Sequence, residues 1–373
     1  MNENKDESSG RVNESVKSTE LALLDGAISE TAEILTDIES QKRVATSPEY
    51  PLEERLEAYE DIFESQVGDT AMNRARNVER EVGLRQLYLK FEGGNPTGTQ
   101  KDRIAFAQVM DALRRGFDAI TVATCGNYGV AIALAAYLAG MRCIIYIPES
   151  YRTKRIMEIE KLDAKIERVP VDYEGAVEVS KKRASRDEIY DANPGGENTA
   201  VQLRAYGEIA YEIYDELRDA PVAVSIPVSN GTTLAGIYKG FVSLYRRGKT
   251  SRIPNIIAGS SFRKNPIIQA FLKNLPHCED LEAERIQETK VNEPLINWHS
   301  IDGDHALTAI RQSKGWADNA SDKNLLEYSK LLRVKEGLAV LPASTAGLIS
   351  LITQHKKEFM PSDRYVALLT GRK

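Results

Sequence analysis

The sequence predicts an α/β protein built on parallel sheets that helices cover on both faces. Three observations support this class. From about residue 68 onward, short apolar or β-branched runs of strand length alternate with longer helix-patterned segments. Three loops rich in small and polar residues each follow one of these runs, which is where open α/β sheets bind ligands. A chain of 373 residues with 42% hydrophobic composition can also bury the core of two subdomains.

The expected strands are short and separated by helical segments. They span residues 87–90, 119–123, 143–148, 166–169, 222–228, 256–259 and 366–369. Helix patterns begin at Ile104, Val130 and Leu234, where apolar residues recur at helical spacing or form a continuous run. No internal repeat is visible along the chain.

The first 50 residues differ in composition from the rest. They carry 11 acidic and 5 basic side chains, and we expect their polar start, residues 2–18, to be disordered. Apolar residues then recur near helical spacing, at Leu21, Leu24, Ile28, Leu35 and Ile38. We therefore expect an N-terminal extension, residues 1–50, with an amphipathic helix that packs on the body of the protein.

Composition argues against several classes of function. A net charge of −6 disfavours nucleic acid or a membrane surface as the main partner, and no apolar run reaches membrane-spanning length. The three cysteines (125, 143, 278) and four histidines (277, 299, 305, 355) show neither disulfide nor metal spacing. We expect a cytoplasmic protein that binds a small molecule and no metal, nucleic acid or membrane.

The first of the three loops places a lysine between a turn and a helix. Lys101 follows the run Gly93-Gly94-Asn95-Pro96-Thr97-Gly98-Thr99-Gln100 and directly precedes the apolar helix pattern. Burial at such a position lowers the pKa of a lysine and frees its amine to form a Schiff base. The alternative is a solvated surface lysine. The other two loops favour the reactive amine.

The second loop combines a strand, small residues and a helix start. The strand at 222–228 is followed by Ser229, Asn230, Gly231, Thr232 and Thr233. Unpaired backbone N–H groups and the positive end of the helix dipole make such a turn an anion site, to which hydroxyl groups add donors. A tight structural connection is the alternative. No Walker-type lysine motif is present.

The third loop lies between the strand at 119–123 and the helix at 130–139. It contains Thr124, Cys125, Gly126, Asn127 and Tyr128. Small residues at a helix start can receive a carboxylate on backbone amides, and Asn127 offers both a donor and an acceptor. A purely structural turn is the alternative here as well.

Taken together, these loops resemble a known family. The order Asn-Pro-Thr-Gly-x-x-Lys-Asp-Arg, x-x-Gly-Asn-x-Gly and Pro-Val-x-Asn-Gly-x-x-Leu-Ala-Gly is similar to that of fold-type II pyridoxal-phosphate enzymes, the tryptophan synthase beta superfamily. Within it, the chain most resembles threonine synthase. The segments 68–70, 336–344 and 368–373 parallel further motifs of that family, so the likeness runs from Gly68 to the C-terminus.

The resemblance implies a particular architecture. Two three-layer α/β/α subdomains would enclose the active site in the cleft between them, in a protein that forms a homodimer. The large subdomain, which binds pyridoxal 5'-phosphate, would comprise residues 51–75, 94–105 and 206–373. The small mobile subdomain would comprise residues 76–93 and 106–205.

The resemblance also implies roles for individual residues. Lys101 would bind the cofactor as a Schiff base and move protons on the substrate, while Asp102 and Arg103 would orient its turn through ion pairing. The phosphate would lie on Ser229, Asn230, Gly231, Thr232 and Thr233. Asn127 would bind the phenolic oxygen of the cofactor, and Thr370, with Ser344 as the alternative, the pyridine nitrogen. Substrate would meet Thr124, Cys125, Gly126 and Tyr128.

The implied reaction is that of a threonine synthase-like carbon–oxygen lyase. Its substrate would be an amino acid with a phosphorylated leaving group, such as O-phosphohomoserine. A cysteate or cysteine synthase-like β-replacement enzyme, an amino-acid ammonia-lyase and a cofactor-binding protein without turnover are the alternatives. Cys125, Tyr128 and Gln100 depart from the usual family residues, and the C-terminal motif stops at Lys373. These departures predict an altered substrate pocket.

Overall fold

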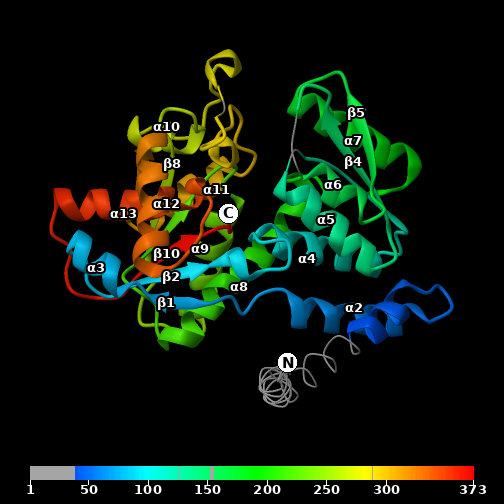
Figure 1. Ribbon diagram of the computed structural model, residues 1–373, viewed down its shortest axis with the longest axis horizontal. Coiled ribbons are helices and arrows are strands. Elements are labelled where there is room, and N and C mark those ends of the chain that lie inside the picture. The colour runs from blue at the N-terminus through cyan, green and yellow to red at the C-terminus, as the bar shows by residue number, and fades with distance from the viewer. Residues whose placement is uncertain (1–37, 125, 152–154, 288) are drawn as a thin grey trace, which may run out of the picture.

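The computed structural model describes residues 38–124, 126–151, 155–287 and 289–373. The expected disordered start and all of the expected amphipathic helix except Ile38 lie outside this part of the chain. Two bodies lie side by side, each with a parallel or mostly parallel sheet between helices (Figure 1). The expected α/β class is confirmed. Within the described residues, no helix combines the length and apolarity needed to cross a membrane.

The larger body contains a six-stranded sheet in the order β1-β2-β10-β7-β8-β9. All of its strand pairs are parallel except β1–β2. The strands are β1 (Met72–Arg74), β2 (Leu87–Phe91), β7 (Ala223–Pro227), β8 (Asn255–Ser261), β9 (Trp316–Ala320) and β10 (Tyr365–Leu369). Strand β10 therefore occupies a central position, between β2 and β7.

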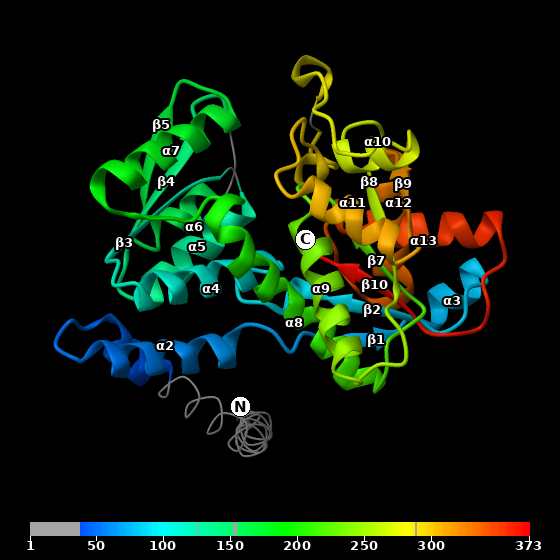
Figure 2. The ribbon, with the colours of Figure 1, turned by 180° about the vertical axis from the view of Figure 1, so that it is seen from behind.

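Alternate residues of this sheet enter different apolar cores, as the period of a strand requires. Val224 and Val366 share a core with α8 (Thr199–Leu217) and α9 (Thr232–Arg246). Their neighbours Ala223 and Ala367 face α12 (Asp322–Glu336) and α13 (Ala346–Lys357) on the other side. Helices α8 and α9 run next to each other along the first face (Figure 2). The remaining helices of this body are α3 (Arg76–Val82), α10 (Pro266–Leu272) and α11 (Gly303–Gln312).

The smaller body contains a four-stranded, fully parallel sheet in the order β5-β4-β3-β6. Its strands are β3 (Ala119–Ala123), β4 (Arg142–Pro148), β5 (Lys165–Val169) and β6 (Tyr190–Asp191). Ile120 and Val122 pack with α4 (Lys101–Arg114), α5 (Asn127–Leu138) and α6 (Ile156–Glu160). Ala119 and Ala123 face α7 (Tyr173–Asp187). The helices again cover both faces.

Two parts of the expected subdomain division differ from the structure. Residues 76–93 were assigned to the small subdomain, but their strand β2 is hydrogen bonded to β10 of the large sheet, because its apolar residues complete that core. Residues 51–75 were assigned to the large subdomain. Their helix α2 (Leu52–Gln66) instead packs on α4, where Tyr59 stacks on Phe106 with ring centroids 6.0 Å apart. A helix at residues 38–46 precedes it.

Candidate active site

The turn before Lys101 is folded by the carboxylate of its neighbour. Asp102 Oδ2 accepts a hydrogen bond from the Thr97 amide at 2.9 Å, and its Oδ1 accepts one from the Thr97 hydroxyl at 2.8 Å. Burial raises the pKa of Asp102 to about 6. Asp102 was expected to orient the turn through an ion pair. It acts mainly through these hydrogen bonds, with a smaller contribution from the charge of Arg155. Lys101 becomes the first residue of α4.

A buried ion-pair network lies beneath this turn. Arg103 forms two hydrogen bonds with Glu92, at 2.6 and 2.9 Å, and two with Glu212 of α8 at the same distances. The Lys90 amine on β2 lies 2.5 Å from Glu212 Oε2. Arg103, Glu92 and Lys90 are each at most 3% exposed. The network therefore joins β2, α4 and α8 beneath the turn that carries Lys101.

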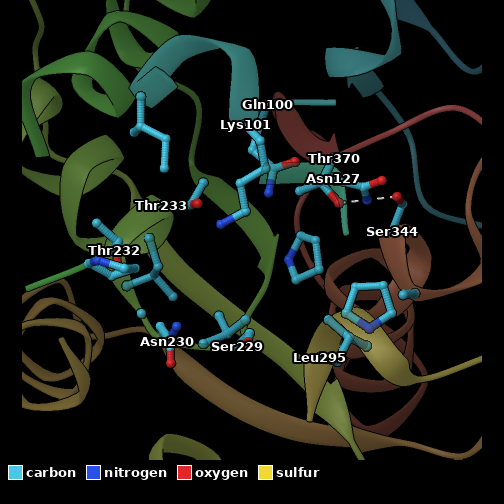
Figure 3. Close-up of a pocket in the computed structure, with 18 of the residues that line it drawn as sticks. Gln100, Lys101, Asn127, Ser229, Asn230, Thr232, Thr233, Leu295, Ser344 and Thr370 are labelled. Carbon is cyan, nitrogen blue, oxygen red and sulfur yellow. Dashed lines mark hydrogen bonds between the residues drawn. The ribbon is translucent and has the colours of Figure 1, made fainter. Parts of the chain in front are cut away.

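Lys101 extends into a cavity between the two bodies (Figure 3). Burial lowers the pKa of its amine to about 8, although the charge of Asp302 opposes this change. The cavity is lined by Gln100, Lys101, Ile104, Asn127, Pro194, Gln202, Pro227, Val228, Ser229, Asn230, Gly231, Thr232, Thr233, Leu234, Pro294, Leu295, Leu341, Ala343, Ser344 and Thr370. The lysine, the second loop, Asn127 and Thr370 thus share one site.

The second loop has the geometry of an anion cradle. It joins β7 to the N-terminus of α9, where the first backbone N–H groups have no partner within the helix. Gly231 precedes that helix with φ +93°, and a Cβ atom there would lie 2.8 Å from both the Asp302 carbonyl oxygen and the Ala306 side chain. Only glycine fits this backbone. The loop therefore suits a phosphate group.

The Thr232 hydroxyl of this loop is hydrogen bonded to another side chain of the same protein. Thr232 donates a hydrogen bond to Asp302 Oδ2 at 2.5 Å, so its proton is not available to an anion, contrary to our expectation. The buried Asp302 also lies 3.4 Å from the Thr199 hydroxyl at the start of α8. It lies 70 residues beyond Thr232, and no motif in the sequence indicated that it reaches the site.

Asn127 begins α5 and lines the cavity. Its Oδ1 accepts a hydrogen bond from Arg155 at 2.5 Å, so the NH₂ group of the same amide is left for a ligand. Arg155 also donates to the Thr97 carbonyl oxygen at 3.0 Å. Sequence reasoning missed Arg155, which lies in no recognised motif.

Thr370 and Ser344 lie together on the opposite side of the cavity from the second loop (Figure 3). Their hydroxyl oxygens are 3.1 Å apart. Ser344 is fully buried and accepts a hydrogen bond from the Gly371 amide at 3.1 Å, whereas Thr370 is partly exposed. The Ser344 hydroxyl can donate either to the Thr370 hydroxyl or to the Gly371 carbonyl oxygen, which lies at 3.3 Å. This arrangement favours Thr370 as the ligand-facing hydroxyl.

The expected substrate residues of the third loop are only partly placed. Cys125 lies outside the described residues, and Thr124 and Gly126 do not line the cavity. Tyr128 is buried in the core, its hydroxyl donates to the Ala192 carbonyl oxygen at 2.8 Å, and its ring centroid lies 5.8 Å from the Lys101 amine. The phenol was expected beside the substrate. It packs inward, because the carbonyl oxygen of Ala192, directly after β6, accepts its proton there.

The fold and site together define a class: a two-body α/β protein with a buried lysine facing a helix start suited to phosphate. A family model described as "Pyridoxal-phosphate dependent enzyme" matches residues 63–371. The chain belongs to this family, and its cofactor is pyridoxal 5'-phosphate. The predicted membership is thereby confirmed.

Curated relatives are similar over most of the chain. Threonine synthase of Methanocaldococcus jannaschii is 30% identical, across 82% of this chain and 74% of the relative. Threonine synthase of Bacillus sp. (strain ULM1) is 29% identical, across 82% of each chain.

Solved structures share the fold. The processed form of threonine deaminase isoform 2 from Solanum lycopersicum matches with a TM-score of 0.69 at 16% identity, covering 85% of this chain and 89% of the other. Maize serine racemase matches with a TM-score of 0.66 at 17% identity, covering 85% and 93%. The fold is that of the fold-type II pyridoxal-phosphate enzymes, as expected.

Proposed function

We propose that the protein is a lyase of the threonine synthase type. It would eliminate or replace an oxygen-linked, phosphorylated group on an amino acid. One observation carries the proposal: a lysine of lowered pKa, a phosphate cradle and a neutral hydroxyl pair line a single cavity. The similarity to threonine synthases over most of the chain supports the same reaction class.

Bound pyridoxal phosphate supplies an electron sink for the pair of electrons left when the substrate loses its α-proton. The chain's own residues then set the outcome. Lys101 takes and returns protons, because its pKa of about 8 leaves part of the amine neutral near pH 7. Thr370 offers a hydroxyl rather than a carboxylate to the ring nitrogen, which favours elimination and replacement over transamination.

The site residues divide the remaining tasks. Ser229 and the backbone from Asn230 to Thr233 would bind the cofactor phosphate, and Asn127 would hold the phenolic oxygen. The N-terminal end of α5, which begins at Asn127, would receive the substrate carboxylate. Cleavage of the carbon–oxygen bond would release inorganic phosphate, with water as the second reactant when threonine is formed.

A panel of amino acids tests the proposal. O-phospho-L-homoserine, O-phospho-L-serine, L-serine and L-threonine are each added to the cofactor-loaded protein, and the cofactor spectrum and released phosphate are measured. We expect O-phospho-L-homoserine to change the spectrum and to release phosphate. Phosphate release from O-phospho-L-serine only with sulfide or sulfite would identify a cysteine or cysteate synthase-like enzyme. Ammonia release from serine or threonine would identify an ammonia-lyase.

The expected cytoplasmic homodimer also belongs to this proposal. Cys143 and Cys278 are free thiols among the described residues, which agrees with a reducing compartment. Sedimentation equilibrium of the cofactor-loaded protein measures the oligomeric state, and a monomer at micromolar concentration would contradict the dimer.

A further inference from the structure

Gln202 is a polar residue on an apolar stripe of α8. It precedes Tyr206, Ile209 and Ile213 by four, seven and eleven positions, which places all four on one face of the helix. Its side chain is 0% exposed. Neither Nε2 nor Oε1 has a hydrogen-bond partner among the described residues. The same residue lines the cavity that contains Lys101.

Close packing of two helices brings this amide to the site. A Cβ atom on Gly236 of α9 would lie 2.8 Å from the Leu203 carbonyl oxygen and 2.7 Å from the Tyr206 side chain. The turn of α8 that carries Gln202 therefore lies directly against the first turns of α9. Those turns begin with Thr232 and Thr233 of the phosphate cradle.

A buried amide without partners is costly, because it loses its bonds to water and gains none. Native structures leave few such groups without a reason. The polar groups of the cofactor already have other residues assigned to them: the cradle for its phosphate, Asn127 for its phenolic oxygen and Thr370 for its ring nitrogen. The Gln202 amide therefore remains available to the second ligand of the cavity, which is the substrate.

We propose that Gln202 recognises the polar side-chain substituent of the amino-acid substrate. The amide donates through Nε2 to an oxygen of that substituent and accepts through Oε1 from a hydroxyl or a monoprotonated phosphoryl oxygen. The substrate class is thus an amino acid with an oxygen-bearing side chain, not an alkyl one. This inference rests on the function proposed above and deepens it.

The test compares two variants with the wild type, all loaded with pyridoxal phosphate. Gln202→Leu removes both unpaired atoms and keeps the volume. Gln108→Leu is the matched control, because Gln108 is also fully buried with an unpaired Oε1 but bonds to Tyr128 and Ala192 and does not line the cavity. The measurements are the melting temperature without amino acid and the dissociation constants of O-phospho-L-homoserine and L-norvaline from cofactor spectra.

We expect Gln202→Leu to melt about 1–4 °C above the wild type, since a buried unsatisfied amide is removed. Its preference for O-phospho-L-homoserine over L-norvaline should fall about three- to tenfold. Gln108→Leu should melt below the wild type with an unchanged preference.

Three results would overturn the inference. A Gln202→Leu protein that melts below the wild type shows that the amide has a structural partner. An unchanged ligand preference in that variant shows that the amide does not contact the substrate. If the wild-type spectrum responds to neither amino acid, the proposed function fails together with the role of Gln202. The first two results overturn the role of Gln202 alone.

Discussion

The guanidinium of Arg155 lies 2.5 Å from the Oδ1 atom of Asn127. The same guanidinium holds the Thr97 carbonyl oxygen of the lysine turn at 3.0 Å, so one side chain joins two of the three loops. Because the amide oxygen is occupied, the amide nitrogen is the group that would bind the phenolic oxygen of pyridoxal phosphate in the proposed site. Arg155 therefore acts as a positioning residue for Asn127.

Arg155→Leu should shift the pH titration of the bound cofactor's absorbance. The midpoint should rise by about one pH unit. The reason is that a weakened donor at the phenolic oxygen stabilises its anion less. A spectrophotometric titration measures the shift. Arg142→Leu is the control, since Arg142 is 68% exposed and pairs with Asp118 at 3.2 Å. An unchanged titration curve together with weaker substrate binding would show that Arg155 contacts the substrate instead.

Lys101→Ala should abolish covalent attachment of the cofactor and leave the fold intact. Borohydride reduction followed by peptide mass spectrometry locates the attachment, and Lys249→Ala, on the surface, should retain it. Reduced cofactor on another lysine of Lys101→Ala would refute the assignment.

The rate of cofactor loading should depend on pH through the same amine. Burial lowers the pKa of Lys101 to about 8, so the fraction of reactive neutral amine increases as pH rises from about 7 to about 9. The rate of cofactor loading should rise with it and then level off. Stopped-flow absorbance measures this rate. A rate that keeps rising toward pH 10.5, the ordinary pKa of a lysine, would indicate a solvated amine.

Gly231→Val should weaken cofactor binding about 10- to 100-fold, because the side chain would need a left-handed backbone and would collide with Asp302 and Ala306. Gly116→Val is matched to it: φ is +78° and a Cβ atom there meets nothing within 4 Å. This control should lose a little stability and keep its cofactor affinity, as measured by fluorescence titration. Equal affinity in both variants would contradict the cradle.

Thr370→Val should retain the cofactor, alter its absorbance and slow turnover about tenfold, since the ring nitrogen loses its hydrogen bond. Thr370→Asp should protonate the ring and increase abortive transamination. Ser344→Ala should have a smaller effect, because Ser344 is fully buried whereas Thr370 is partly exposed. If Ser344→Ala alone changes the spectrum, Ser344 is the partner of the nitrogen.

Acid should weaken the fold through Glu212. Burial alone would raise its pKa, but hydrogen bonds and charges of Arg103 and then Lys90 lower it from 4.5 to about 2. The folded-state pKa lies below the unfolded one, so this stabilisation is present above pH 4.5 and is lost as pH falls toward 2. Glu212→Gln should cost about 3–5 kcal/mol at pH 7 and flatten the acid limb of a urea-unfolding series. An unchanged acid limb would contradict the network.

The strands that sequence predicted best are those buried on both faces. The expected run 119–123 matches β3 completely, and 366–369 misses one residue of β10, because continuous apolar composition marks such strands. Strand β9 was missed, since Trp316-Ala317-Asp318-Asn319-Ala320 is an edge strand with polar residues. Strand β1, at the opposite edge, has three residues and too short a pattern to detect.

The candidate site was predictable where loops follow strands. Lys101, the cradle at Gly231 and Thr370 line one cavity because their strands end at the same edge of the fold. Gln202 lies within α8 and Arg155 directly precedes α6, away from those loops, and their places in the site depend on tertiary packing alone. For Gln202, the only signal in the sequence is a polar residue on an apolar stripe.

The central place of β10 sets an order for assembly of the protein. Strand β2, which leads into the lysine turn, meets β7, which leads into the phosphate cradle, only through β10. Long stretches of chain separate these three strands in the sequence. Their pairing should therefore be slow. Until the last of them is inserted, the sheet that carries the lysine turn and the cradle is incomplete. Tight binding of pyridoxal phosphate should therefore require β10 to be in place, because Thr370 follows this strand directly and lines the cavity.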